Sequence, residues 1–131
     1  MSGENVDIIR RLIPANKKSQ EECLPYLAPD LEIVPMDHFP DRTIFHGPSG
    51  WERWSTRWTS MFDEHELTIG RTWEAGDQVV VELSERVKSA GSSFPLVNAY
   101  AHVWTFRNGL VTRLEIFRQL DDALAAAGMS E

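Results

Sequence analysis

The hydrophobic period of this chain changes near its middle, and that change limits the folds it can adopt. Over residues 1–62, apolar residues recur every three or four positions, which is typical of amphipathic helices. Over residues 65–119, apolar and polar residues alternate, which is typical of half-buried strands. Asn108-Gly109 separates the last two alternating runs and predicts a hairpin, because both residues tolerate positive φ. Helices followed by a strand meander predict an α+β fold.

Two helices and a strand are expected before residue 37. The first helix should run from about Gly3 to Ile13 and end at Pro14, which lacks an amide donor. A short helix should begin at Ser19, and an apolar strand should follow at Leu31–Met36.

The third helix has the clearest signals. Ser49 and Glu52 have the spacing of a capping box at its start. Its apolar face is interpreted as core, with a ligand cage as the alternative, and carries Trp51, Trp54 and Trp58.

Four strands should form an antiparallel sheet with helices packed on one face. The space between sheet and helices then becomes either packed core or a pocket. A short helix, starting at Asp121 or Asp122, should close the chain before Gly128. The expected strands are His65–Trp73, Gln78–Lys88, Leu96–Arg107 and Leu110–Gln119.

Strand alternation predicts which side chains point inward. In the last strand these are Thr112, Leu114, Ile116 and Arg118. The strand before it has one large, polar-tipped face with Asn98, Tyr100, His102 and Trp104, and one small apolar face with Val97, Ala99, Ala101 and Val103. The small face suggests a second sheet packed against it, which predicts a homodimer through the sheet.

Size and charge exclude several classes of function. The 131 residues suit a single domain, 1–131, and the net charge of −7 disfavours nucleic acid and anionic membranes as partners. No apolar run approaches the length of a membrane span, and there is no signal-peptide pattern. Because Cys23 is the only cysteine, a reducing, cytoplasmic location is expected.

No strong catalytic motif or metal-ligand spacing is present, so we expect neither a metal nor another cofactor. His102 is the best acid–base candidate, because it lies in mid-strand on the aromatic face. A hydrogen-bonded core histidine is the alternative. Glu85 lies on an otherwise apolar row, and Arg118 could pair with such an acid or bind an anionic substrate; either could instead be structural.

Asp37 and His38 follow the first strand, where a pocket rim would lie. Asp37 could activate water or abstract a substrate proton, although such residues are also common turn formers. The side chains expected to line the pocket are Tyr100, Trp104, Asn98, Trp54, Trp58, Leu114, Ile116 and His38.

Six segments together resemble the SnoaL-like proteins of the nuclear transport factor 2-like superfamily. They are Ser2–Leu12, Leu27–Glu32, Phe45–Gly47, Glu74–Val79, Ala101–Gly109 and Asp121–Gly128. The resemblance implies a cone-shaped, curved antiparallel sheet wrapped around N-terminal helices and enclosing an apolar pocket, often in a dimer. Relatives of this group include ketosteroid isomerase and polyketide cyclases.

The resemblance also allows a comparison of site residues with ketosteroid isomerase. Its oxyanion-hole tyrosine would fall at Ile13 or Pro14, which have no side-chain donor. Its catalytic base would fall near Pro35, with Asp37 the closest acid, and its buried aspartate matches His102.

The sequence therefore predicts a protein that binds a small apolar or cyclic molecule. If it is an enzyme, the chemistry would be cofactor-free proton transfer of the isomerase, cyclase, dehydratase or hydrolase type. The alternatives are a binder without turnover and a dimerisation scaffold whose cavity is filled by its own side chains.

Overall fold

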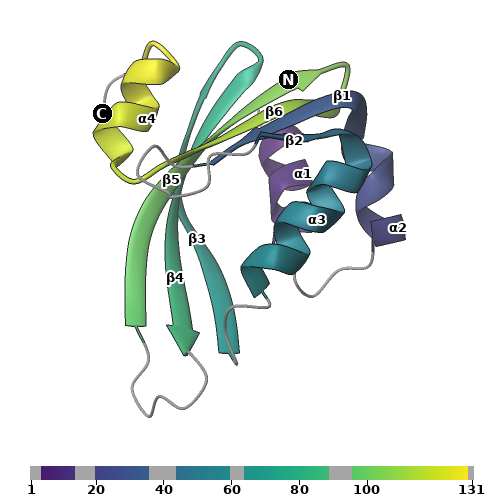
Figure 1. The fold of residues 1–131 in the computed structure, drawn as a ribbon. Helices are drawn as coiled ribbons and strands as arrows, with labels where there is room; N and C mark the ends of the chain where they lie inside the picture. The colour runs from purple at the N-terminus through teal and green to yellow at the C-terminus, as the bar shows by residue number, and fades with distance from the viewer. Residues whose placement is uncertain (1–3, 14–19, 36–43, 60–63, 89–95, 130–131) are drawn as a thin grey trace.

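The computed structural model describes residues 4–13, 20–35, 44–59, 64–88 and 96–129 (Figure 1). The helices are α1 Glu4–Leu12, α2 Gln20–Cys23, α3 Gly47–Thr59 and α4 Leu120–Ala126, with a 3₁₀ turn at Leu24–Tyr26. The strands are β1 Leu27–Val34, β2 Phe45–His46, β3 Glu64–Ala75, β4 Gln78–Lys88, β5 Leu96–Arg107 and β6 Leu110–Phe117.

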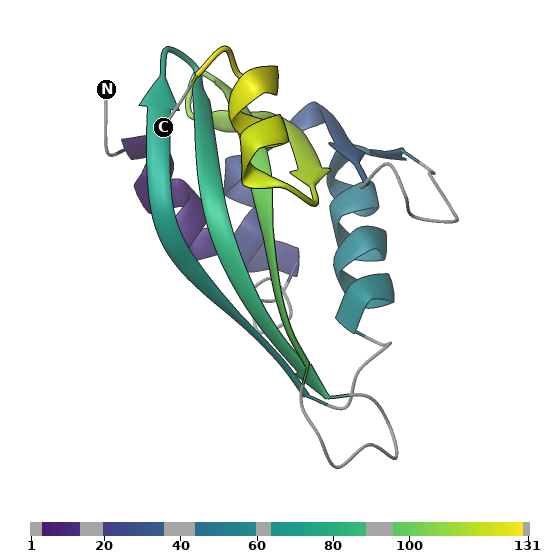
Figure 2. The same ribbon diagram turned by 90° about the vertical axis from the view of Figure 1, so that its left-hand side faces the viewer.

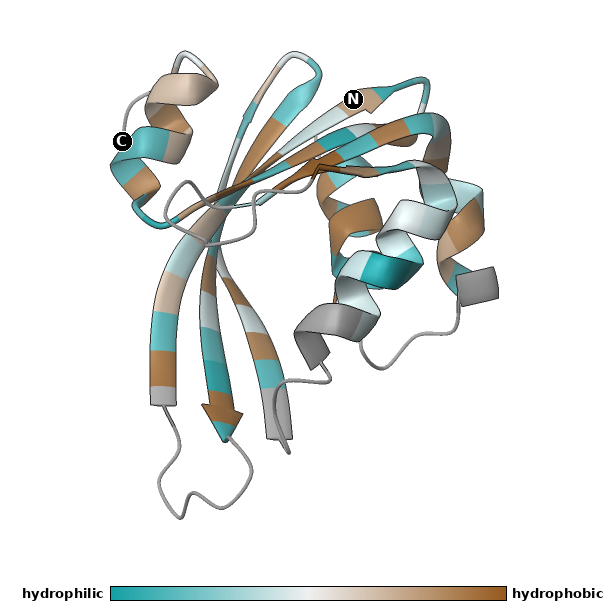
Figure 3. Cartoon of the chain, in the orientation of Figure 1, coloured by the Kyte–Doolittle hydropathy of each residue, from teal (hydrophilic) through white to brown (hydrophobic). Residues whose placement is uncertain are grey.

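The strands form one curved sheet in the order β2-β1-β6-β5-β4-β3. Helices α1, α2 and α3 lie on its concave side, called the inner face here, and α4 lies on the convex outer face (Figures 1 and 2). Figure 3 shows hydrophobic and hydrophilic bands alternating along β4, as a sheet with two different faces requires. The predicted α+β fold is confirmed.

The sheet is mixed rather than wholly antiparallel, because β1 runs parallel to β6. Alternation shows which residues share a face, but it carries no information about the direction of neighbours that are distant in sequence. The hairpin predictions are correct: β4 and β5 have the expected bounds, and Asn108 and Gly109 adopt φ values of 53° and 80°.

Two element boundaries and one additional strand in the first half differ from the prediction. Strand β1 begins at Leu27, four residues before the expected start, and β2 was not predicted at all. Helix α3 begins at Gly47 instead of Ser49, because Gly47 turns the chain with a φ of 71° and Pro48 suits a first helical turn.

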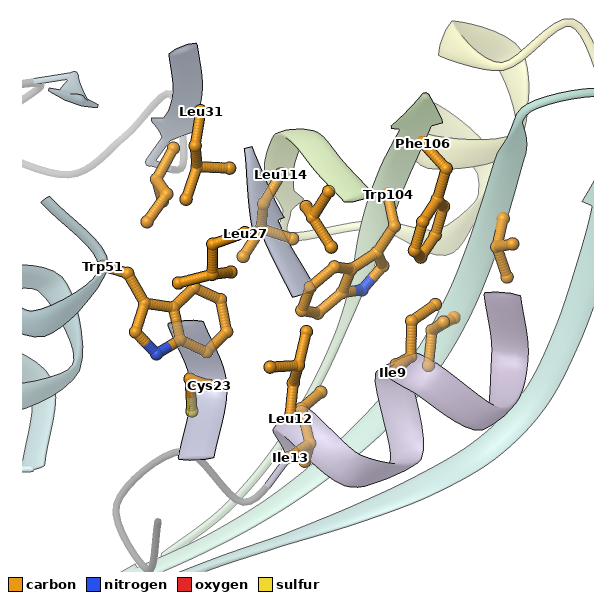
Figure 4. Packing of buried hydrophobic residues seen from close by; sticks show 14 of the residues in the cluster. Ile9, Leu12, Ile13, Cys23, Leu27, Leu31, Trp51, Trp104, Phe106 and Leu114 are labelled. Atoms are coloured by element: carbon orange, nitrogen blue, oxygen red, sulfur yellow. The ribbon is translucent and has the colours of Figure 1, made fainter. Parts of the chain in front are cut away.

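The deep part of the concave side is packed core. Trp51 of α3 and Trp104 of β5 are almost completely buried, with ring centroids 6.1 Å apart (Figure 4). They pack with Leu12 of α1, with Ile13 directly after it and with Leu114 of β6. The interpretation of Trp51 as a core residue is confirmed.

The small-residue face of β5 packs against a helix and not against the second sheet that was predicted. Ala123 and Leu124 of α4 pack against Val80, Ala101 and Val103, so the chain's own C-terminal helix occupies the place given to a second sheet. Small side chains on both surfaces allow this close approach. Val97 and Ala99, nearer the start of β5, remain exposed.

Candidate functional site

A polar cluster lies on the inner face where β4 and β5 pair. Glu85, with 1% of its surface exposed, lies opposite Asn98 in the register of the two strands. The Tyr100 hydroxyl donates a hydrogen bond to Glu85 Oε2 over 3.1 Å, and Asn98 Nδ2 donates to Glu85 Oε1 over 3.5 Å. The cluster therefore holds a buried carboxyl group at a fixed position on an otherwise apolar row.

The Tyr100 hydroxyl keeps its proton and therefore remains a hydrogen-bond donor in this cluster. Burial raises the pKa of its hydroxyl well above the ordinary value of 10.0, and the charge of Glu85 raises it further. The phenol therefore remains protonated at neutral pH and keeps its hydrogen bond to the carboxyl group.

His102 is the next inward-facing residue of β5 after Tyr100, and 2% of its surface is exposed. Burial lowers the pKa of its imidazole to about 3, so the ring is neutral at pH 7. Its Nδ1 and the neighbouring Trp104 Nε1 have no hydrogen-bond partner among the residues that the structure describes. A neutral imidazole can orient a polar ligand atom, but it accepts a proton poorly.

Aromatic rings surround His102. Its ring centroid lies 5.5 Å from that of Tyr100, 5.6 Å from that of Trp104 and 6.5 Å from that of Trp54. Trp54 is only half-buried and contacts the buried Trp51 at 5.3 Å. The partly buried side chains that border the core here are Trp54, Leu67, Ile69 and Tyr100.

The remaining pocket candidates and the catalytic candidate Asp37 lie in different places. Leu114 is fully buried in the core, and Ile116 is half-buried opposite His102 in the sheet register. Asp37 and His38 lie outside the described residues. Trp58 belongs to α3, but its side chain is outside the described part of the chain.

Arg118 is not on the inner face where alternation placed it. Strand β6 ends at Phe117, and the exposed Arg118 borders a hollow of about 170 Å³ that adjoins α4 on the outer side. Because the strand has ended, the alternation rule no longer applies to this residue. The residues around the hollow are Glu82, Ala99, Tyr100, Arg118, Gln119 and Leu120.

No group of three or more potential metal-binding side chains occurs within the described ranges. Within the same ranges, no helix is long and apolar enough to cross a membrane.

The family of this chain follows from its similarity to known proteins. The family model described as a SnoaL-like domain matches residues 15–114. The chain belongs to the SnoaL-like family. Comparison with curated proteins gave no match.

Solved structures resemble this SnoaL-like chain in fold. TerC, co-crystallised with polyporic acid, is 21% identical with a TM-score of 0.75, over 97% of this chain and 98% of its own. A protein from Jannaschia sp. CCS1, described as a SnoaL-like polyketide cyclase, is 15% identical with a TM-score of 0.76, over 98% of this chain and 94% of its own. A protein from Catenulispora acidiphila with a ketosteroid isomerase-like fold, in complex with trimethylamine, is 21% identical with a TM-score of 0.73, over 95% and 94%.

Every residue of this cluster can be picked out as a candidate from the sequence, but the hydrogen bonds between them cannot. It placed Glu85 on one strand and Asn98 and Tyr100 on the next, without the register that makes Asn98 face Glu85. The residues of the turn between the strands do not reveal that register, because a seven-residue connection allows several pairings.

Proposed function

We propose that this SnoaL-like protein binds a small, largely apolar cyclic or aromatic molecule beside the inner-face cluster and acts on it by cofactor-free proton transfer. Glu85 is the general base, and Tyr100 is a positioning residue that holds its carboxyl group. His102 is a neutral hydrogen-bonding group that orients the substrate. The observation that carries the proposal is the 3.1 Å hydrogen bond between Tyr100 and Glu85 on an apolar, aromatic face.

The assignment of the base differs from the expectation that His102 would be the acid–base residue. An imidazole with a pKa of about 3 is mostly unprotonated at pH 7 and is a weak base. We assign the base to Glu85 instead, because Tyr100 and Asn98 hold its carboxyl group in a fixed position on the inner face. Arg118, on the outer side, has no part in this mechanism. Asp37, which lies outside the described residues, stays a candidate from the sequence alone.

Two features of the relatives support a small-molecule site. TerC was crystallised with polyporic acid, and the Catenulispora protein with trimethylamine, so this fold accommodates small ligands in other proteins. The Jannaschia protein is described as a polyketide cyclase. Cyclisation and isomerisation both begin with removal of a proton next to a carbonyl group, which a positioned carboxylate can perform.

Binding without turnover is the second candidate, and one observation favours it. Both carboxyl oxygens of Glu85 accept hydrogen bonds within the protein, which is also what a structural buried carboxylate would do. Ligands that raise the melting temperature without being consumed would support this candidate.

Proton exchange gives a test that needs no knowledge of the natural substrate. The protein is mixed with 2-tetralone in D₂O, and loss of the proton signal next to the carbonyl is followed by NMR. Glu85→Gln should slow the protein-catalysed exchange by about 100-fold or more, as loss of a general base does. Glu82→Gln is the matched control, because Glu82 lies on the same strand and pairs with Arg71 away from the cluster.

The control should exchange as fast as the wild type. Equal exchange rates for the wild type and Glu85→Gln would exclude Glu85 as the base. Exchange no faster than in buffer, combined with ligand-dependent stabilisation, would favour the binder.

We also propose that the protein forms a homodimer through the part of the outer face that α4 leaves open. Val97 is 69% exposed there, and Ala99 is exposed beside it. Val97→Glu should shift the sedimentation coefficient from dimer to monomer, because a charge in an apolar interface is costly. A wild-type protein that sediments as a monomer at high concentration would exclude the dimer.

A further inference from the structure

The first part of β5 has a strand beside it on one side only. Residues 96–100 pair with residues 83–87 of β4. Strand β6 ends at Phe117, opposite Ala101, so none of the described strands pairs with the other side of residues 96–100. Figure 1 shows this stretch at the margin of the sheet, below the end of β6 and below α4. We call residues 96–100 the β5 edge.

The β5 edge lacks the features by which proteins protect an unpaired strand. Its sequence, Leu-Val-Asn-Ala-Tyr, contains no charged residue and no proline. The edge strand at the other side of the sheet, β3, has exposed charges at Glu66, Arg71 and Glu74 and a register shift between Ile69 and Thr72. Charges and bulges of this kind hinder pairing with another chain. The β5 edge is therefore open to pairing with a further strand.

The side chains of the β5 edge form a projection beside a hollow. Val97 is 69% exposed, and Ala99 is exposed on the same outer face. Ala99 also borders the hollow of about 170 Å³, together with Leu120 at the start of α4. An apolar projection and a hollow two positions apart on one strand can fill each other in two copies related by a twofold axis.

This complementarity defines a register. When two β5 edges pair antiparallel about a twofold axis at Asn98, Val97 of each copy lies directly opposite Ala99 of the other. Side chains that are directly opposite point to the same face, with Cβ atoms about 5 Å apart. Val97 of each copy then reaches the hollow of the other. The paired segments are uncharged, so the net charge of −7 on each copy brings no like charges together between them.

We propose that two copies of this chain pair through their β5 edges, antiparallel about Asn98, with Val97 of each copy in the hollow beside Ala99 of the other. The proposal rests on the homodimer proposed above and states how its two copies meet. The two sheets join along their margins into one continuous sheet instead of stacking face to face.

The partner also contributes to the candidate site. Asn98 is exposed, although it donates a hydrogen bond to Glu85 on the inner face. In the paired edges, the partner's Asn98 lies directly opposite it on the same face. The partner therefore shields from water the hydrogen bond that holds the proposed base.

Amide hydrogen exchange, measured residue by residue by NMR, tests the pairing. The comparison is between the wild-type dimer and Val97→Glu, which should be monomeric and folded because Val97 is exposed. Along the β5 edge, every second amide should exchange about tenfold or more slowly in the wild type, because these amides face away from β4 and donate to the partner strand. Equal exchange rates at every position of the edge would overturn the proposal.

Leu24→Glu is the matched control for introducing a charge at an exposed apolar position. Leu24 is 43% exposed and belongs to the 3₁₀ turn before β1, not to the β5 edge. This variant should sediment as a dimer and keep the slow exchange of the wild type. If it is monomeric like Val97→Glu, the effect of Val97→Glu is not specific to the edge, and the proposal fails.

The register can be measured in a dimer of one ¹³C,¹⁵N-labelled copy and one unlabelled copy. Isotope-filtered NOEs should connect the methyl groups of Val97 in one copy with that of Ala99 in the other. They should also connect backbone protons of residues 97–99 across the two copies. Side-chain NOEs without backbone NOEs would show face-to-face packing and would overturn edge pairing.

The outcomes distinguish this proposal from those above. A dimer without slow exchange at alternate amides would retain the homodimer and exclude edge pairing. A monomer at high concentration would exclude both and would leave the edge to a strand of another protein. Exchange of 2-tetralone tests the proposed reaction separately from either result.

Discussion

Tyr100 and Glu85 lie on neighbouring strands, and their side chains meet on the inner face with the phenol donating to Glu85 Oε2 over 3.1 Å. Glu85 is opposite Asn98 in the register, so Tyr100 is its diagonal neighbour, a distance that a tyrosine side chain can bridge. The hydrogen bond offsets part of the cost of burying a carboxyl group among apolar residues. It therefore links the stability of the sheet to the position of the proposed base.

This pair should show strong energetic coupling. Tyr100→Phe removes one donor from a buried carboxyl group and should lower the free energy of unfolding by about 1–3 kcal/mol. In a double-mutant cycle with Glu85→Gln, measured by urea unfolding, the coupling should be about 0.5–3 kcal/mol. Additive effects of the two substitutions would show that the hydrogen bond contributes nothing to stability.

The titration of Tyr100 should depend on Glu85. The charge of Glu85 raises the pKa of the Tyr100 hydroxyl, in second place after burial. Glu85→Gln should therefore lower that pKa toward its ordinary value of 10.0 without reaching it. The ¹³Cζ chemical shift of Tyr100, followed by NMR as the pH is raised, measures the change, and an unchanged midpoint would contradict the electrostatic explanation.

Burial of His102 should make stability fall in mild acid. Its pKa is about 3 in the folded protein and 6.5 in the unfolded chain, so the unfolded state binds more protons between these values. The contribution of His102 to the free energy of unfolding is fully present above pH 6.5 and is lost as the pH falls toward 3. The loss between pH 7 and pH 4.5 should be about 2 to 3 kcal/mol by linkage.

The histidine variants separate this effect from other titrations. His102→Gln should remove most of the pH dependence of urea unfolding between pH 7 and pH 4.5. His46→Gln, at an exposed position on β2, serves as the control and should behave like the wild type. If the free energy of unfolding of His102→Gln still falls between pH 7 and pH 4.5, another group causes the pH dependence.

Two tryptophans of α3 should differ in their effect on stability. Trp51 is 1% exposed in the core, and its replacement by Ala should cost about 3–5 kcal/mol of unfolding free energy. Trp54 is half-buried, so Trp54→Ala should cost less than half as much. Calorimetric melting of both variants measures the difference, and equal losses would contradict the distinction between core and border.

Local pattern predicted the parts of the fold that depend on neighbours in the sequence. The bounds of β4 and β5 and the Asn108-Gly109 turn follow from alternation and from the φ preferences of two residues. The parallel pairing of β1 with β6 and the packing of α4 on Ala101 and Val103 involve segments far apart in the chain. No local preference encodes such contacts.

The candidate site shows the same division. Strand alternation alone places Glu85 on an apolar row and puts Asn98, Tyr100, His102 and Trp104 on one face. The contacts of Glu85 with Asn98 and Tyr100, the burial and neutral state of His102, and the position of Arg118 on the outer side follow from the folded sheet. Register, burial and the end of a strand depend on what packs against each residue, and that is fixed only when the whole sheet and its helices come together.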